Sequence, residues 1–242
     1  MKYVVVIPAR YQSVRLPGKP LIKIAGVPMV ERTYRQCLEA VPAENIIIAT
    51  DDERIEAHAK SIGANVMMTP VECETGTDRI ASLLDHVDAG RFINVQGDEP
   101  ILDPEDLATV VAEAKKGDAE VINGYSEITD SEQFFSRTVP KVVFRPNGDL
   151  LYMSRNPVPI NKSGEFVKGW RQICIYSFSR EALALYGPGK TKTTLEEVED
   201  IEILRLVENN IPIKMVPLSG KSLAVDVPED VIKVEERLKR SE

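Results

Sequence analysis

The chain of 242 residues is poor in the side chains that many kinds of active site require. It has two histidines, His58 and His86, and both fall in stretches of helical spacing away from every candidate motif, which argues against a histidine general base. Cys37, Cys73 and Cys174 are far apart and form no C-x-x-C pair, so neither a disulfide framework nor a structural zinc site is expected. We therefore expect a reducing, cytoplasmic location.

Long apolar runs and an excess of positive charge are also missing. No stretch approaches the roughly 20 apolar residues of a membrane helix, and the N-terminus lacks the pattern of a signal peptide. The formal net charge is −8, with acidic and basic residues mixed along the chain. We therefore expect neither a nucleic acid nor a membrane as partner.

What the sequence does contain is a regular alternation of short apolar runs and helical spacing over its first half. Helical spacing is clearest at 29–38, 80–87 and 107–114. Strand and helix in alternation predict an α/β fold, with a Rossmann-like, mainly parallel sheet and helices on both of its faces. The expected strands are 3–8, 45–50, 65–69, 91–96 and 120–125.

The pattern changes after about residue 130. Runs typical of strands at 141–144, 150–154 and 172–177 follow one another without helical spacing, and Pro146-Asn147-Gly148 is typical of a hairpin turn. We interpret the chain as one domain, 1–242, with a small antiparallel insertion at about 135–190. Two helices, at about 195–208 and 229–239, are expected to flank a final strand at 213–217.

The first apolar run leads directly into a cationic loop. Arg10 and Arg15 follow it, and Lys19 lies within Leu16-Pro17-Gly18-Lys19-Pro20. Strands of parallel sheets present such loops at their carboxyl ends, where ligands bind, and glycine permits close approach of the backbone. The loop predicts a polyphosphate pocket, and an ordinary surface loop with solvated basic residues is the alternative.

Two aspartates stand at the ends of further apolar runs. Asp98 follows the strand expected at 91–96, and Asp226 follows a short strand-like run just before the last helix. Mg²⁺ prefers one or two carboxylates together with waters and substrate phosphates, so the pair predicts a magnesium site. The alternatives are local roles, with Asp98 and Glu99 in a turn or capping the next helix and Asp226 as a helix N-cap.

Two strand-to-helix junctions carry further polar residues. At Thr75-Gly76-Thr77-Asp78-Arg79, the helix start and the arginine predict contact with a nucleotide or an acidic group. Equally, Thr77 or Asp78 could cap a helix beginning near Arg79. At Thr50-Asp51-Asp52 we favour capping alone.

Together these motifs resemble the 3-deoxy-manno-octulosonate (Kdo) cytidylyltransferase family. They occur in the family's order over nearly the whole chain, as Ile7-Pro8-Ala9-Arg10 with Leu16-Pro17-Gly18-Lys19-Pro20, then Thr75-Gly76-Thr77-Asp78-Arg79, Asn94-Val95-Gln96-Gly97-Asp98-Glu99-Pro100 and Val225-Asp226-Val227-Pro228-Glu229-Asp230.

The resemblance implies a homodimeric enzyme with a nucleotidyltransferase fold that needs CTP and Mg²⁺. It would transfer CMP to the anomeric hydroxyl of a 2-keto sugar acid, releasing pyrophosphate, for lipopolysaccharide or capsule biosynthesis. The resemblance also implies the residues of the site. The catalytic residues would be Lys19, Arg10 and Asp98, and the metal ligands Asp98 and Asp226. The nucleotide would be bound by Ala9, Arg10, Arg15, Lys19, Thr75, Arg79 and Gln96, and the sugar by Gln96, Arg155, Gln172, Tyr176 and Glu202.

The chain departs from the family in two segments assigned to the sugar. The family's Lys-His-x-Gly-Ile-Tyr reads Arg171-Gln172-Ile173-Cys174-Ile175-Tyr176, and its Leu-Glu-Gln-Leu-Arg reads Ile201-Glu202-Ile203-Leu204-Arg205. Gln172 thus replaces a histidine and Ile203 a glutamine. Altered polar partners change discrimination between substrates, so 8-amino-Kdo or another 2-keto sugar acid is an alternative acceptor, unless waters or neighbouring side chains compensate.

Two other classes stay open. A nucleotidyltransferase of ordinary sugar phosphates would share the fold and the basic loop, and an inactive nucleotide-binding or assembly protein would bind nucleotide without releasing pyrophosphate. A P-loop phosphotransferase is excluded, because no G-x-x-x-x-G-K-[ST] pattern occurs.

Overall fold

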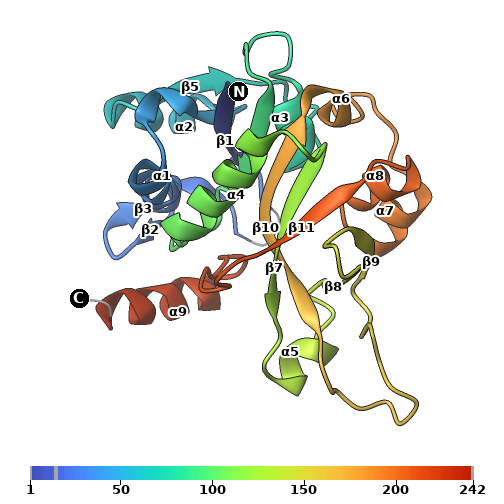
Figure 1. The fold of residues 1–242 in the computed structure, drawn as a ribbon. Coiled ribbons are helices and arrows are strands. Elements are labelled where there is room, and N and C mark those ends of the chain that lie inside the picture. The colour runs from blue at the N-terminus through green and yellow to red at the C-terminus, as the bar shows by residue number, and fades with distance from the viewer. Residues whose placement is uncertain (1, 14–15, 241–242) are drawn as a thin grey trace.

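The computed structural model describes residues 2–13 and 16–240, and its centre is one large mixed sheet (Figure 1). Its strands are β1 (Tyr3–Ala9), β4 (Ile46–Thr50), β5 (Val66–Met68), β6 (Arg91–Val95), β7 (Val121–Glu127), β8 (Lys141–Phe144), β9 (Leu150–Ser154), β10 (Trp170–Ser179) and β11 (Ile213–Pro217). The order along the sheet is β11-β7-β10-β6-β1-β4-β5. β1 runs parallel to β4 and β6, and β10 runs antiparallel between β6 and β7.

Alternating side chains of β1 explain why helices cover both faces of the sheet. Val5 and Ile7 pack in a cluster with residues of α1, α2 and α4, whereas Val4 and Val6 pack in a second cluster with residues of α3, α6 and α8. Each such buried side chain contributes roughly 1.5–3 kcal/mol. The helices are α1 (Met29–Ala40), α2 (Glu53–Ser61), α3 (Gly76–Ala81), α4 (Pro104–Lys116), α5 (Ser131–Phe135), α6 (Arg180–Leu183), α7 (Thr194–Glu199), α8 (Leu204–Glu208) and α9 (Pro228–Lys239).

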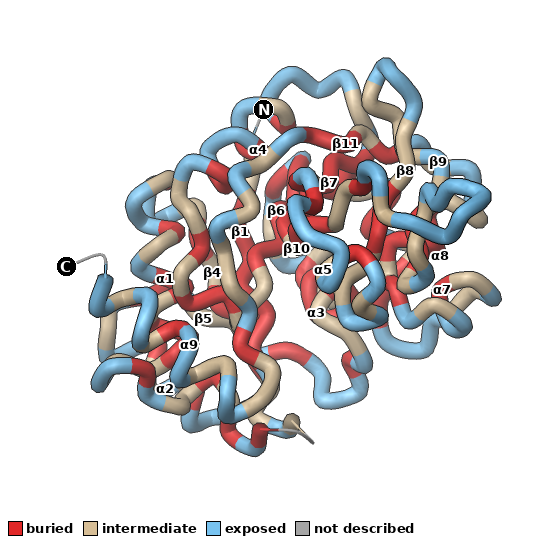
Figure 2. Tube along the Cα trace, turned by 90° about the horizontal axis from the view of Figure 1, so that it is seen from below, coloured by how far each residue is buried: buried red, intermediate tan, exposed pale blue. Residues whose placement is uncertain are grey.

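The α/β prediction is therefore confirmed, and buried residues follow the strands through the middle of the molecule (Figure 2). The antiparallel part is also present, since β8 pairs with β9 and β10. Its turn forms as expected, with Gly148 N donating to Arg145 O at 2.8 Å. The limits 135–190 stay a prediction, because β10 belongs both to this part and to the main sheet.

Buried Lys141 secures the base of the antiparallel part. Its ammonium donates to the backbone oxygens of Ser136 and Val139 at 2.7 Å and of Arg155 at 2.5 Å. Burial lowers the pKa of Lys141, because these dipoles replace water only partly. The contact ties the start of β8 to the end of β9.

Three expectations about helices and one about a strand were wrong. The helix expected at 195–208 is two helices, because Asp200 adopts a left-handed conformation with φ 51° and ends α7. The spacing at 80–87 yields a helix only to Ala81, followed by turns, and the helix expected near Arg79 begins at Gly76. The strand expected before Asp226 is an irregular segment.

A third, smaller core brings the end of the chain against its beginning. Leu16 and Ile24 of the N-terminal region pack with Val225 and with Val234 of α9. Ile24 belongs to a separate hairpin formed by β2 (Lys23–Ile24) and β3 (Val27–Pro28). This packing places the segment around Asp226 beside the basic loop. No helix in the described part of the chain is long and apolar enough to cross a membrane.

Candidate active site

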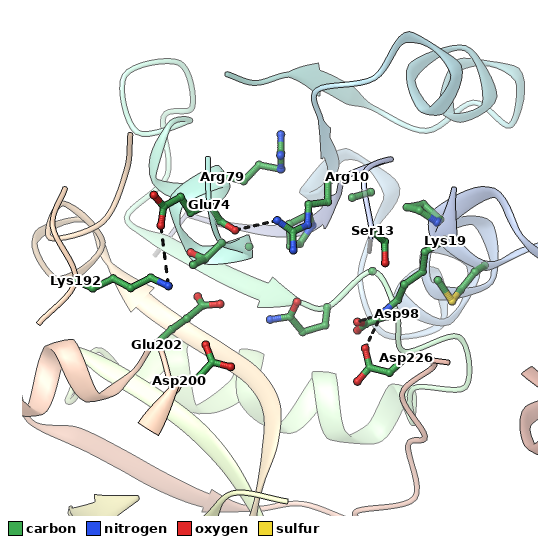
Figure 3. Close-up of a pocket in the computed structure, with 18 residues that line it drawn as sticks. Arg10, Ser13, Lys19, Glu74, Arg79, Asp98, Lys192, Asp200, Glu202 and Asp226 are labelled. Atoms are coloured by element: carbon green, nitrogen blue, oxygen red, sulfur yellow. Dashed lines mark hydrogen bonds and ion pairs between the residues drawn. The ribbon is translucent and has the colours of Figure 1, made fainter. Parts of the chain in front are cut away.

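A cavity of about 540 Å³ opens at the carboxyl ends of β1 and β6. The chain leaves β1 through α1 to β4 on one side, while β6 lies on the other side, so the cavity sits at a switch in strand order, where open α/β sheets bind ligands. Its polar lining residues (Figure 3) include Arg10, Ser13, Lys19, Glu74, Thr75, Arg79, Gln96, Asp98, Lys192, Asp200, Glu202 and Asp226.

One side of the cavity holds Lys19 between Asp98 and Asp226, a group we call the Lys19 cluster. Lys19 Nζ lies 2.7 Å from Asp98 Oδ2 and 2.9 Å from Asp226 Oδ1 (Figure 3). Burial alone would lower the pKa of Lys19, but the two carboxylates outweigh it and the pKa is raised. Burial and the charge of Asp98 raise the pKa of the neighbouring Glu99 to about 7.

Backbone contacts explain how residues so far apart in sequence meet here. Val225 N donates to Asp98 O at 2.9 Å, which joins the two acidic segments. A Cβ on Gly97 would lie 2.6 Å from Pro8 O, so only glycine lets the loop after β6 approach the end of β1 this closely. The local alternative for Asp226 does not hold, because Asp230 accepts the backbone N–H of Asp226 at 3.1 Å and the Asp226 carboxylate turns to Lys19.

The Lys19 cluster has the donor set of a magnesium site that depends on substrate. Asp98 and Asp226 supply two carboxylates, and no group of three or more His, Cys, Asp or Glu side chains able to hold a metal occurs among residues 2–13 and 16–240. Two carboxylates suit Mg²⁺, which keeps several waters and binds substrate phosphates, better than a metal that needs a full protein cage. The residues present therefore fit the ion expected from the sequence.

The predicted nucleotide residues that the structure describes line the same cavity, and two of them, Arg10 and Thr75, also make hydrogen bonds that stabilise the backbone around it. Arg10 Nη1 donates to Glu74 O at 3.1 Å. Thr75 Oγ1 accepts from Asp78 N at 3.0 Å and thereby caps α3, so the capping role left open for this junction falls to Thr75. Arg79 is 2% exposed. Ala9 and Gln96 also line the cavity, and Arg15 lies outside the described residues.

The Thr50-Asp51-Asp52 junction has two functions rather than the one expected. Asp52 caps α2 by accepting from Arg54 N at 2.9 Å, as predicted. Asp51 instead accepts from Arg79 Nη2 at 2.8 Å and so holds that guanidinium at the cavity wall. Helix propensity at the junction gave no sign of this partner 28 residues away.

The predicted sugar residues divide into two groups. Gln96 and Glu202 line the cavity. Burial raises the pKa of Glu202, although its Oε2 accepts from Thr77 N at 3.3 Å. Gln172 is buried away from the cavity lining, and its Nε2 donates to Tyr176 Oη at 3.0 Å and to Asn123 Oδ1 at 3.2 Å.

The structure places two further residues of the sugar segments, Arg155 and Ile203, away from the cavity lining. Arg155 does not line the cavity, and its guanidinium donates to the backbone oxygens of Arg137, Glu199 and Asp200. Ile203 is 1% exposed and belongs to the apolar core, so the missing glutamine there cannot touch a ligand directly. The position of Ile203 follows from the helix break at Asp200, which sequence periodicity did not reveal.

Three charged residues of the cavity were not predicted: Glu74, Lys192 and Asp200. With Glu202 they form what we call the Lys192 group. Asp200 gave no signal in the sequence. The sequence did contain a signal for Lys192, because residues 187–193 form a loop rich in glycine, lysine and threonine. This composition is typical of anion-binding loops.

The family model for cytidylyltransferases matches residues 4–215 of the chain. With the α/β fold and the cavity at the switch point, this match defines the chain as a cytidylyltransferase. Relatives that match over nearly the full length identify the family within this class. The 3-deoxy-manno-octulosonate cytidylyltransferase of Myxococcus xanthus is 41% identical, covering 96% of this chain and 94% of its own, and that of Geobacter metallireducens is 39% identical, covering 99% of each. The chain belongs to the 3-deoxy-manno-octulosonate cytidylyltransferase family.

Solved structures agree with this membership. A CMP:2-keto-3-deoxy-manno-octonic acid synthetase complexed with CTP superposes with a TM-score of 0.93 at 33% identity and covers 100% of both chains. HddC from Yersinia pseudotuberculosis, at 18% identity and a TM-score of 0.71, shares the fold.

Proposed function

We propose that this cavity transfers CMP from CTP to the anomeric hydroxyl of Kdo and releases pyrophosphate. The observation that carries the proposal is the Lys19 cluster, in which one ammonium and two carboxylates converge where strands β1 and β6 end. Nucleotidyl transfer depends mainly on positioning and on stabilisation of charge, so it needs no protein nucleophile. This agrees with the positions of His58 and His86, neither of which lines the cavity.

Four side chains of the cavity have a direct role in that reaction. Lys19 and Arg10 bind the triphosphate and neutralise the charge that develops on the departing pyrophosphate. Gln96 and Glu202 hold hydroxyls of the acceptor opposite that leaving group. Glu202 is held at the cavity for this role by Thr77, whose backbone N–H donates to Glu202 Oε2 at 3.3 Å.

Asp98 and Asp226 are the residues that would hold Mg²⁺. When bound there, the ion would neutralise phosphate charge and add electrostatic stabilisation to that from Lys19. Lys19 contacts both carboxylates, so one positive charge in the cluster faces two negative charges, and a cation bound there would compensate the remaining one. We propose in addition that the enzyme is a homodimer, as the resemblance implies, and that it is cytoplasmic, as the scattered cysteines indicate.

The test is pyrophosphate release from CTP and Mg²⁺ with Kdo, 8-amino-Kdo and N-acetylneuraminate at matched concentrations. We expect Kdo to be preferred, because Gln172 and Ile203 do not line the cavity and their replacement leaves its lining unchanged. Preference for another acid would replace Kdo in the proposal, and release with none of them would refute it.

Asp98→Asn tests the metal assignment. The change keeps the shape of the side chain but removes the charge that a divalent ion requires, so we expect kcat to fall by about 100-fold even at saturating Mg²⁺. Asp103→Asn, at the N-cap of α4, is a matched control and should keep the wild-type rate. An Asp98→Asn enzyme that retains most of its activity would show that Asp98 is not a magnesium ligand.

A further inference from the structure

Two segments of the chain bring a mainly acidic set of side chains to the acceptor side of the cavity. Lys192, Asp200 and Glu202 approach from the region around α7, and Glu74 faces them from the loop before α3 (Figure 3). Three carboxyl groups and one ammonium therefore meet where the acceptor is expected. A sugar acid carries a carboxylate of its own, so it meets repulsion on this side unless a cation compensates.

Among the residues that the structure describes, the other cations that line the cavity have partners of their own. Arg79 is 2% exposed and pairs with Asp51 at 2.8 Å. Lys19 is held by the two carboxylates of its cluster, and Arg10 donates to Glu74 O at 3.1 Å from the loop assigned to the triphosphate. Arg79 and Lys19 are thus held by carboxylates, and Arg10, which is exposed, is assigned to the triphosphate and not to the acceptor.

Arg155, to which the resemblance gives a sugar contact, is not available either. Its guanidinium donates to Glu199 O at 2.6 Å, Asp200 O at 2.8 Å and Arg137 O at 3.1 Å. These bonds fix the turn between α7 and α8 and leave Arg155 outside the cavity lining. Its role in this chain is to position Asp200 and Glu202.

Lys192 differs from all of these cations. Its Nζ lies 4.0 Å from Glu74 Oε2, beyond hydrogen-bond distance, and its side chain is 35% exposed. In the part of the chain that the structure describes, its ammonium donates no hydrogen bond to protein, and only this loose pair holds it at the cavity. A flexible stem lets such an ammonium turn to a ligand at little cost.

We propose that Lys192 binds the carboxylate of the sugar acid and thereby selects an anionic acceptor. This role rests on the proposed function. The carboxylate then takes the place of Glu74 as the partner of Lys192, and the hydroxyls of the acceptor lie against Glu202 and Gln96. Lys192 acts on acceptor binding and takes no part in binding the triphosphate.

The test compares three variants by steady-state kinetics, each substrate being varied while the other saturates. For Lys192→Met, which removes the charge and keeps an apolar stem, we expect the KM for Kdo to rise at least about tenfold and the KM for CTP to stay within about twofold. Lys192→Arg should recover most of the loss. Lys190→Met, exposed in the same loop and outside the cavity lining, is the control and should resemble wild type.

A second readout separates this role from a structural one. Wild type should prefer Kdo to its uncharged C1 carboxamide, and Lys192→Met should lose that preference while keeping the same melting temperature. An unchanged KM for Kdo, or an equal rise in the KM for CTP, in an active wild-type background would overturn the role of Lys192 alone. A wild-type enzyme that releases no pyrophosphate with any acid would instead refute the proposed function, and the role of Lys192 with it.

Discussion

The two sides of the cavity differ in how closely their charged side chains are held. In the Lys19 cluster the charges lie 2.7 and 2.9 Å apart, and the Lys19 side chain is 14% exposed. In the Lys192 group the corresponding ion pair spans 4.0 Å, and the Glu74 side chain is 74% exposed. Charges that are fixed in advance stabilise a transition state most, because nothing has to reorganise during the reaction. Loose charges suit the recognition of a substrate that must enter and leave.

The rigid side owes its geometry to backbone contacts. The loop after β6 approaches the end of β1 through Gly97, and the segment before α9 is joined to the same loop by a hydrogen bond from Val225 N to Asp98 O. On the opposite side, Asp200 and Glu202 are positioned by the turn between α7 and α8. A change in the Lys19 cluster should therefore reduce kcat, and a change in the Lys192 group should mainly alter the KM for the acceptor.

Lys19→Met is expected to have the largest effect. It leaves Asp98 and Asp226 with uncompensated charge and removes a cation from the triphosphate, so kcat should fall by about 1,000-fold. Stopped or continuous assays of pyrophosphate release would measure this. Lys23→Met, at an exposed position in β2, makes the same chemical change nearby and should keep wild-type kinetics. A loss confined to the KM for the acceptor would contradict the division between the two sides.

Gly97→Ala tests whether that rigidity depends on backbone approach. The added Cβ would lie 2.6 Å from Pro8 O, so the loop carrying Asp98 must move. We expect unfolding free energy to fall by about 1–3 kcal/mol and kcat to fall by about 10- to 100-fold through misplacement of Asp98.

Gly26→Ala is the control for this change. Gly26 has φ 80° with no atom within 4 Å of an added Cβ, so its replacement strains the backbone in open space. It should cost stability without changing kcat. Equal kcat for wild type and Gly97→Ala would mean that the close approach serves folding only.

The contrast between the two sides also explains what could be predicted from the sequence. Lys19 and Asp98 follow strands whose apolar runs are unmistakable, and strand ends of a parallel sheet converge, so their meeting was predictable. The contact of Lys19 with both carboxylates at once was not, because it depends on the packing of α9 against the hairpin at Ile24.

Prediction was poorer on the acceptor side because its geometry depends on a few irregular residues. Asp200 in a left-handed conformation divides a continuous helical pattern, which turns Ile203 into the core and brings Glu202 to the cavity. A register shift in β10 between Ile173 and Tyr176 similarly accompanies the inward turn of Gln172. Periodicity averages over such single residues, so it places the elements but not these side chains.

Asp200→Asn should have the smallest effect, and it tests whether the Lys192 group selects the acceptor by charge. The Asp200 side chain is 83% exposed and makes one long contact, at 3.4 Å, to Arg155, so its loss should leave kcat and stability near wild type. Because it removes a negative charge beside Lys192, the KM for Kdo should fall by about two- to threefold, whereas the KM for 8-amino-Kdo, whose ammonium a carboxylate attracts, should rise. Glu197→Gln, exposed on α7 outside the cavity lining, removes the same charge nearby and should change neither KM. A higher KM for Kdo in Asp200→Asn would mean that Asp200 binds the acceptor through its hydroxyls, and the Lys192 group would then select by shape more than by charge.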